Sequence, residues 1–204
     1  YLKGGSEIVI AIDELISEQK ILEEDLEVTL VGDLNRQNSH AMNEYQDTKA
    51  FTDSIEHIIN KSKNIKILSN IKNEDLLKII KEHHIGLLPT WADTFGYSVL
   101  EFQASGCPVV STNVRALPEI NNPEIGWIID INTNTLGEVV IDSLEKKEAT
   151  RRIIINNLKA IILEATQNKE SIRQKAIKAL KQIEDMHSTE EYNRKIKEIY
   201  NGRN

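Results

Sequence analysis

Short apolar runs alternate along the first 132 residues with amphipathic stretches of helical spacing. The apolar runs are rich in Ile, Val and Leu and are too short for helices. We therefore expect strands at residues 26–32, 65–68, 85–89, 107–112 and 126–130. Apolar residues three or four positions apart predict helices around residues 8–16 and at residues 40–61, 73–81 and 95–104. This alternation predicts an α/β fold class, a doubly wound and mostly parallel sheet with helices on both faces.

From Thr133 onward the pattern is helical to the end of the chain. Ser188 and Glu191 have the spacing of a reciprocal helix cap, which predicts a last helix that ends near Tyr200. A chain of 204 residues fits one domain of ordinary size. We divide it into an α/β core at about residues 1–132 and a helical tail at about residues 133–204.

The balance of charges and the cysteine count narrow the function classes. The chain carries 25 Lys and Arg residues against 32 Asp and Glu residues, a formal net charge of −7. Net negative charge repels a polyphosphate backbone, so we expect no nucleic acid partner. A single cysteine, Cys107, excludes a disulfide framework and a Cys-rich zinc site and fits a reducing compartment, so the expected location is cytoplasmic. No apolar run approaches the roughly 20 residues that a membrane-spanning helix needs.

Residues 151–187 are basic, with eight Lys and Arg side chains against four acidic ones. A basic amphipathic helix can lie on anionic lipid, which would make the chain a peripheral protein at the inner face of the membrane. The favoured interpretation is a solvated helical face, because the apolar residues of this stretch are needed to cover the sheet.

Several common catalytic signatures are absent from the chain. It has neither the G-x-G-x-x-G loop of dinucleotide-binding proteins nor the G-x-x-x-x-G-K-[ST] loop of P-loop proteins. None of the five histidines has a partner four residues away, so we expect no bound metal. Cys107 falls at the start of a predicted buried strand, where cysteine acts as a small hydrophobe rather than a nucleophile.

The informative segment, residues 88–110, runs from strand through loop, helix and turn to the next strand. Gly96 lies at the predicted start of the helix, where uncovered amides bind anions and glycine lets a phosphate or sugar approach closely. Asp93 precedes this helix and Glu101 follows eight residues later, so the two carboxylates could bracket one elongated ligand. The arrangement suits a nucleotide diphosphate sugar. The alternative is that Asp93 or Thr94 only caps the helix and that Glu101 is solvated.

This stretch resembles the donor-binding signature of retaining glycosyltransferases with the GT-B fold, of the family 4 or group 1 type. Lys3 and Gly4 are similar to the basic step before the first helix of that family, and residues 192–200 to its closing helix. The resemblance covers nearly the whole chain and identifies it as the C-terminal, donor-binding half of such an enzyme, with a Rossmann-like fold. The residues that keep the signature are Phe95, Gly96, Glu101, Ala104, Gly106, Pro108, Val109, Val110, Thr112, Pro118 and Glu119.

The resemblance implies roles for individual residues. Glu101 would bind the ribose hydroxyls, and Asp93, the catalytic candidate, would face the donor sugar. Lys3 would counter the phosphate charge, unless it is simply a solvated surface lysine. Ser69 and Ile71 would meet the nucleobase. The remaining donor-binding candidates are Thr94, Phe95, Gly96, Tyr97 and Ser98, with the amides of the last three on sugar and diphosphate.

Arg115 is a weaker phosphate candidate, and a surface position in its loop is the favoured interpretation. The family requires no metal, and no other cofactor is expected, because the UDP- or GDP-linked sugar is the substrate. The intact enzyme would transfer a sugar with retention of configuration to a glycan, a lipid or a small molecule, as in polysaccharide biosynthesis. This chain alone would bind the donor and scarcely catalyse.

Two features depart from the family pattern. Asp93 stands where the family usually has Glu, which shortens the reach to the sugar by one methylene. The partner expected in the intact protein, an N-terminal acceptor domain, is absent, as are the arginine and the strand that normally precede Lys3. That strand would be central in the sheet, so either the chain is a fragment or an upstream segment supplies the strand. The alternatives are a non-catalytic nucleotide-sugar sensor and, disfavoured by the Phe95 to Glu101 pattern, a nucleotide-sugar epimerase.

Overall fold

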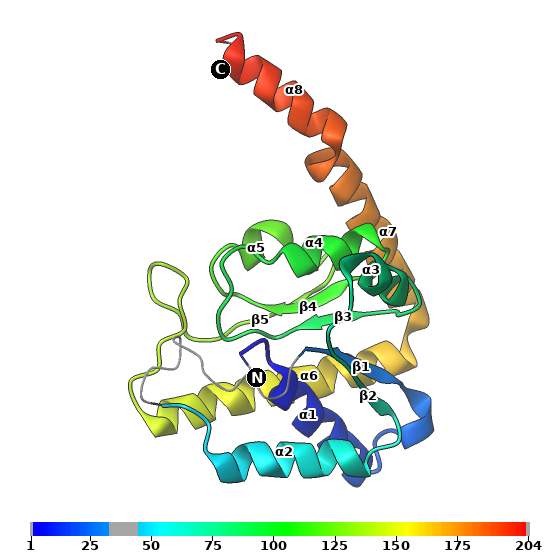
Figure 1. Cartoon of the computed structure of the whole chain (residues 1–204), viewed down its shortest axis with the longest axis vertical. Helices are drawn as coiled ribbons and strands as arrows, with labels where there is room; N and C mark the ends of the chain where they lie inside the picture. Colours follow the sequence, from blue (N-terminus) through cyan, green and yellow to red (C-terminus); the bar gives the residue numbers. More distant parts are fainter. Residues whose placement is uncertain (1, 33–44, 203–204) are drawn as a thin grey trace.

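The computed structural model describes residues 2–32 and 45–202 (Figure 1). The strands are β1 (Val28–Val31), β2 (Ile65–Leu68), β3 (Gly86–Leu88), β4 (Val109–Thr112) and β5 (Trp127–Ile129). The helices are α1 (Gly5–Ser17), α2 (Lys49–Lys61), α3 (Asn73–Lys81), α4 (Tyr97–Ala104), α5 (Leu117–Ile120), α6 (Leu144–Gln167), α7 (Lys169–His187) and α8 (Thr189–Tyr200), with a 3₁₀ turn at Glu23–Asp25. The predicted α/β alternation is confirmed.

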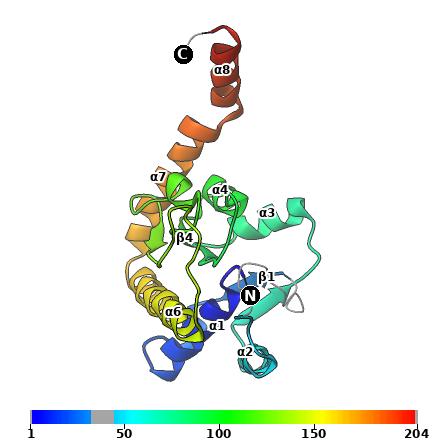
Figure 2. The same cartoon turned by 90° about the vertical axis from the view of Figure 1, so that its left-hand side faces the viewer.

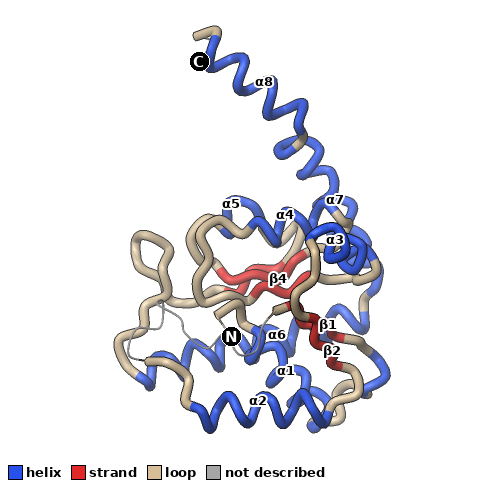
Figure 3. Tube along the Cα trace, in the orientation of Figure 1, coloured by secondary structure: helices blue, strands red, loops and turns tan. Residues whose placement is uncertain are grey.

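All strand pairs among the described residues are parallel, but they form two sheets rather than one (Figure 3). β1 pairs with β2, with Val28 opposite Ile65. β4 lies between β3 and β5, with Val110 opposite both Leu87 and Trp127. Within the described residues no strand joins β1 to β3, which is where a single sheet would need one more strand.

Helices cover both faces of the three-stranded sheet (Figure 1). α4 and α5 lie on one face, whereas α1 and α6 lie on the other and pack against each other. The core between these layers is aliphatic and includes Ile12 of α1, Val110 of β4 and Leu158 of α6. Burial of this apolar surface is the main term that holds the layers together.

The helices after residue 132 differ in how they pack. α6 buries Ile154, Ile155 and Leu158 against the body of the protein and is therefore part of its core. α7 packs on α4, and α8 extends away from the body with no buried residue (Figures 1 and 2). Residues 133–143 are not helical. They form a loop with one bridge between Thr133 and Val139, and α6 begins only after Ser143, whose hydroxyl accepts the Lys146 amide at 3.1 Å.

Helix caps account for two start points that the sequence pattern placed too early. α2 begins at Lys49 instead of His40, because Thr48 Oγ1 accepts a hydrogen bond from the Phe51 amide at 3.2 Å and residues 45–48 are not helical. Residues 40–44 of the predicted helix lie outside the described residues. α4 begins at Tyr97, because Gly96 adopts a left-handed conformation with φ of 89°.

The predicted last helix and its cap are confirmed in part. The hydroxyl of Ser188 accepts the Glu191 amide at 3.2 Å, which is one half of the reciprocal cap. The Glu191 carboxylate does not return the contact, because it pairs with Arg194 at 2.6 Å.

Most basic side chains between residues 151 and 187 have an acceptor within the described part of the protein. Arg152 and Lys159 pair with Glu14 of α1, at 2.6 and 2.9 Å. Lys175 donates to the carbonyl of Gly126 at 2.9 Å and lies 4.8 Å from the ring centre of Trp127. These contacts attach α6 and α7 to the core. They favour the interpretation that these basic side chains stabilise the fold and do not lie on lipid. None of the described helices is long and apolar enough to cross a bilayer.

Candidate functional site

The carboxyl ends of β3 and β4 form the edge at which the signature residues lie. Thr112 at the end of β4 donates its hydroxyl to the Thr90 carbonyl at 2.6 Å, which joins the two strand ends. The loop after β3 then leads to Gly96 and the first turn of α4. Parallel sheets bind their ligands at this edge.

Asp93 organises the loop that starts α4. Its Oδ1 accepts hydrogen bonds from the Gly96 amide at 3.0 Å and the Phe95 amide at 3.3 Å. These bonds shape the turn that leads into α4, but they do not cap the helix, because its N-cap, Gly96, has no side-chain cap bond. The next two amides, those of Tyr97 and Ser98, donate to no group within the described residues and remain available to a ligand.

The start of α1 meets the same edge. The Trp91 amide donates to the Leu2 carbonyl at 2.9 Å, which fixes the segment before α1 beside the end of β3. Gly4 is the N-cap of α1 with φ of 82°, and a Cβ there would lie 2.2 Å from the Pro89 carbonyl oxygen. Only glycine allows this close approach. Two helix N-termini, each with partial positive charge, therefore lie at one edge of the sheet.

Lys3 and Asp93 are brought together. The Lys3 ammonium pairs with Asp93 Oδ2, so the two predicted ligand-facing groups contact each other across the two helix starts. The Lys3 side chain is 56% exposed and that of Asp93 11% exposed. Both oxygens of Asp93 thus have partners within the fold: Oδ2 has Lys3, and Oδ1 has the Phe95 and Gly96 amides, which precede α4.

Glu101 lies one helical turn beyond the free amides of α4. Its side chain is half-buried and makes no hydrogen bond or ion pair within the described residues, so its carboxylate is available. The Ser98 hydroxyl is likewise without a partner there. Tyr97 is exposed and its ring lies 5.0 Å from that of Phe95, between centroids. Thr94 is exposed, and its side chain makes no cap bond to α4 in the described part of the chain.

The predicted nucleobase loop follows a strand of the other sheet from the one that carries the Asp93 loop. Ser69 and Ile71 follow β2 of the two-stranded sheet, with Ser69 exposed and Ile71 half-buried. Asn70 between them adopts a left-handed conformation with φ of 55°. Within the described residues no hydrogen bond or ion pair joins this loop to the one around Asp93.

Arg115 lies in the loop after β4 and is engaged by a neighbouring loop. Its guanidinium pairs with Glu138, and its amide donates to the Gly137 carbonyl at 2.9 Å. Its own backbone is left-handed, with φ of 47°. Arg115 is therefore a loop residue with a counterion in the folded chain.

Cys107 is buried and its environment disfavours the thiolate. Burial raises the pKa of its thiol to about 11. The thiol lies 2.9 Å from the carbonyl oxygen of His83, to which it donates. In the described residues no three His, Cys, Asp or Glu side chains are grouped so that they could hold a metal ion.

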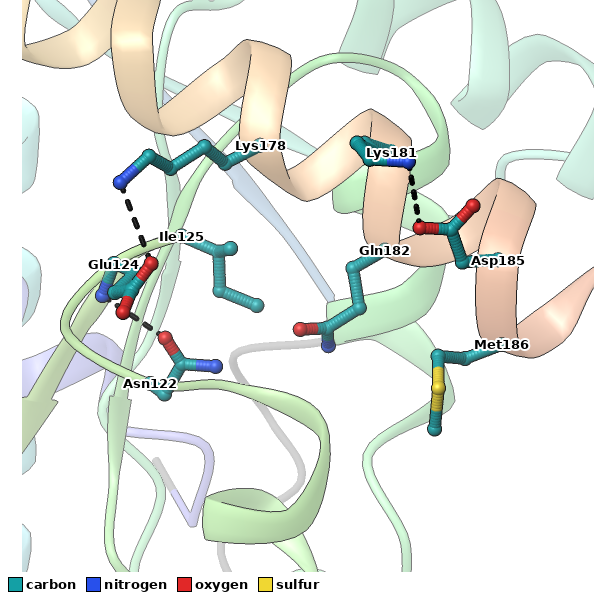
Figure 4. Close-up of a pocket in the computed structure, with 8 residues that line it drawn as sticks. All are labelled: Asn122, Glu124, Ile125, Lys178, Lys181, Gln182, Asp185 and Met186. Carbon is teal, nitrogen blue, oxygen red and sulfur yellow. Dashed lines mark hydrogen bonds and ion pairs between the residues drawn. The ribbon is translucent and has the colours of Figure 1, made fainter.

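A groove of about 500 Å³ lies at the opposite edge of the sheet (Figure 4). It is bounded by the loop before β5 and the end of α7, and Figure 4 shows Lys178 and Glu124 paired across one end. Because that loop precedes β5, the groove faces the amino ends of the strands and lies away from Asp93. It contains none of the predicted site residues.

The backbone contacts of Leu2 and Trp91 were not predicted from the sequence. They depend on main-chain atoms 89 positions apart in the chain, which carry no residue-specific signal. The large apolar side chain of Trp91 in the loop after β3 was an available indication that this loop packs against another segment.

Comparisons with known proteins agree with the resemblance. The family model described as "Glycosyl transferases group 1" matches residues 3–160. A relative described as an uncharacterized 41.2 kDa protein in the cps region of Klebsiella pneumoniae is 24% identical over 161 residues. The match covers 70% of this chain and 45% of that protein, so the chain spans less than half of the relative.

Solved structures share the fold at low sequence identity. The C-terminal domain of LpcC, a glycosyl transferase group 1 family protein from Francisella tularensis, has a TM-score of 0.62 and 15% identity, over 92% of this chain and 81% of that chain. The structure of TarM has a TM-score of 0.63 and 16% identity, over 98% of this chain and 33% of that chain.

Proposed function

The chain belongs to the group 1 glycosyl transferases, and we propose that it is the donor-binding half of a retaining enzyme that uses a nucleotide diphosphate sugar. The observation that carries the proposal is the meeting of the α1 and α4 N-termini at one edge of the sheet, beside Lys3. Uncovered amides and an ammonium group at one place favour a ligand with concentrated negative charge, such as a diphosphate.

In this proposal the free amides of Tyr97 and Ser98 bind the diphosphate and Lys3 adds a positive charge. Hydrogen-bond donors that are already oriented stabilise the charge that develops on the leaving diphosphate. Stabilising this charge in the transition state lowers the barrier to transfer more than uniform binding of the substrate does. No metal or other cofactor is required for this role. Glu101, one turn along α4, accepts hydrogen bonds from the ribose hydroxyls.

Asp93 is the proposed contact to the donor sugar, and its partners limit how it acts. Its two oxygens bind the Lys3 ammonium and the Phe95 and Gly96 amides just before α4. A sugar hydroxyl therefore shares an oxygen with one of these groups or replaces Lys3. The proposal includes three finer points. The donor is UDP- or GDP-linked, the sugar is a hexose, and its configuration is retained.

The acceptor site is proposed to lie in another domain of the whole protein. The relative from Klebsiella pneumoniae has more than twice the length that this chain matches, which leaves room for such a domain. We further propose that the strand between β1 and β3 comes from the segment before Leu2, because Leu2 already bonds to the end of β3. The chain alone then binds donor with little catalysis. A glycan acceptor, as in polysaccharide biosynthesis, is the first class to test.

A second candidate function is a non-catalytic nucleotide-sugar sensor. The specific observation that favours it is the ion pair between Lys3 and Asp93, which leaves the sugar-facing carboxylate already satisfied. Transfer of labelled sugar by the whole protein separates the two functions, because a sensor binds the donor and releases it unchanged.

Calorimetric titration with UDP, GDP and ADP tests the proposed site. We expect saturable binding of one nucleotide, abolished by Glu101→Ala and unchanged by Glu124→Ala, which alters an exposed carboxylate at the far groove. Circular dichroism establishes that each variant is folded. Binding of no nucleotide by the folded chain, or equal binding by the Glu101→Ala variant, contradicts the proposal.

A further inference from the structure

A group of four charged side chains, three of them buried and one half-buried, lies behind the proposed donor site. Glu7 lies in the first turn of α1, Asp47 in the segment before α2, and Lys147 and Arg151 in α6. Their exposed fractions are 1% for Glu7, 16% for Asp47, 3% for Lys147 and 5% for Arg151. Buried charges of this kind persist only when they are paired, and here two acidic groups face two basic ones.

Arg151 is the member of this group that pairs with both acidic side chains, Glu7 and Asp47. Its Nε lies 3.0 Å from Glu7 Oε1, and its Nη2 lies 2.5 Å from Asp47 Oδ1, which also accepts Lys147 Nζ at 2.5 Å. A third nitrogen, Nη1, lies 2.5 Å from Glu148 Oε1 at the surface. The planar guanidinium can serve several acceptors in this way, which an ammonium group cannot match.

The same guanidinium packs on two aromatic rings. Its central carbon lies 4.2 Å from the ring centre of Phe51 in α2 and 5.9 Å from that of Trp91. Trp91 is 2% exposed and lies two residues before Asp93 in the same loop. Its amide donates the hydrogen bond to the Leu2 carbonyl. Arg151 therefore joins α6 to the first turn of α1 and to the base of the loop that carries Asp93.

The electrostatic consequence concerns the phosphate end of the site. Burial alone would lower the pKa of Arg151, but the carboxylates of Glu7 and Asp47 outweigh it and raise the pKa, so the guanidinium stays charged. Its charge offsets that of Glu7, which lies three residues from the N-cap of α1. Without Arg151 this carboxylate would oppose any anion bound at the start of α1.

We propose that Arg151 is a positioning residue for the diphosphate of the donor, an inference that rests on the proposed function. It holds the α1 N-terminus against the loop after β3 and cancels the negative charge behind them, without touching the ligand. Within the described residues no ion pair or ring contact joins it to the loop of Ser69 and Ile71, so we expect the nucleobase end of the site not to depend on it.

The test compares nucleotides with nucleosides on Arg151 variants. The protein is titrated with UDP, GDP and ADP and with uridine, guanosine and adenosine, at a temperature where circular dichroism shows every variant folded. For Arg151→Met we expect the Kd of the preferred nucleotide to rise at least about tenfold, while the Kd of its nucleoside changes less than about twofold. Arg151→Lys gives an intermediate rise, because it keeps the charge and loses the fork.

Two further variants complete the design. Arg152→Met removes the neighbouring exposed arginine, which pairs with Glu14 of the same helix α1, and leaves nucleotide binding unchanged. Combining Arg151→Met with Glu7→Gln removes one buried charge of each sign and restores part of the affinity. If Arg151→Met does not fold, Arg151→Lys and the double variant carry the comparison.

The outcomes that overturn each proposal are distinct. Equal loss of nucleotide and nucleoside affinity, or unchanged nucleotide binding in the folded Arg151 variants, overturns the positioning role and leaves the donor site intact. Absence of nucleotide binding by the unsubstituted protein overturns the proposed function itself.

Discussion

The ammonium group of Lys3 pairs with the carboxylate of Asp93, which lies 90 positions later in the chain. The pair joins the segment before α1 to the loop before α4, and so it connects the two helix starts that form the proposed site. A diphosphate bound at these amides would compete with Asp93 for Lys3. The pair is thus both a structural link and the first contact that a donor would change.

Substitution of the two partners separates these roles. Lys3→Met should weaken nucleotide binding several-fold and lower the free energy of unfolding by no more than about 1 kcal/mol, because Lys3 is exposed. Asp93→Ala should cost about 1 kcal/mol or more, since the Phe95 and Gly96 amides lose their acceptor. Asp93→Asn keeps that acceptor and should cost less. Urea denaturation and nucleotide titration measure the two effects. Equal stability of the Ala and Asn variants would contradict the role of Asp93 as the acceptor that orders the turn before α4.

Alanine substitutions at Gly4 and Gly5 form a matched pair that tests how closely the start of α1 approaches Pro89. Gly4→Ala forces a side chain into a left-handed conformation and places its Cβ 2.2 Å from the Pro89 carbonyl oxygen. The strain of that conformation alone is about 1–2 kcal/mol, and the collision adds to it, so we expect a loss above about 2 kcal/mol. A Cβ at Gly5 meets nothing within 4 Å, and Gly5→Ala should leave stability unchanged or raise it by up to about 1 kcal/mol.

Chemical denaturation of the two glycine variants decides this prediction. Equal stabilities would show that the segment of Leu2 to Gly4 does not lie against β3 in solution. The Gly4→Ala variant should also lose nucleotide affinity, because the N-terminus of α1 must move away from the end of β3.

Cys107 should be inert in the folded protein. A rise of its pKa from 9.0 to about 11 lowers the thiolate fraction near pH 8 by about 100-fold, and burial further restricts access. Alkylation by iodoacetamide at pH 8 should therefore be at least that much slower for the native chain than in urea. Comparable rates in the two conditions would show that the thiol is accessible.

The same shift predicts how stability depends on pH. In the unfolded chain the thiol ionises near its ordinary pKa of 9.0, whereas in the folded chain it stays neutral until about 11. The contribution of the neutral Cys107 thiol to the free energy of unfolding is therefore fully present below pH 9 and is lost as the pH rises from 9 to 11. Cys107→Ala should remove this part of the alkaline loss of stability, as urea denaturation at several pH values would show.

The basic stretch of residues 151–187 should not bind membranes. Its ion pairs with α1 and with the loop before β5 already use many of its charges. We expect no co-sedimentation with vesicles of anionic phospholipid at physiological salt. Binding that falls when the exposed Arg173 and Lys181 are replaced by Gln would contradict this expectation, because it would assign these side chains to the lipid.

The order and type of most elements through residue 132 could be predicted from the sequence, and in places their bounds as well, whereas α5 and the loop at residues 133–143 were not predicted. β2 at residues 65–68 and α3 at residues 73–81 form where the pattern predicted them. Helix and strand periodicity are local properties, so a window of about ten residues contains the information. The signature around Gly96 was likewise readable, because it combines a backbone requirement for glycine with its neighbours in the chain.

The tertiary structure decided what these elements contact. Only the fold shows that Lys3 pairs with Asp93 and that Arg151 is buried against Glu7, because each pair is distant in sequence and a lone charged residue is normally exposed. The role of α6 in the core and the separation of the strands into two sheets also follow from packing. Local periodicity states which face of an element is apolar. Which surface covers that face is decided by the free energy of burying the whole set of faces together.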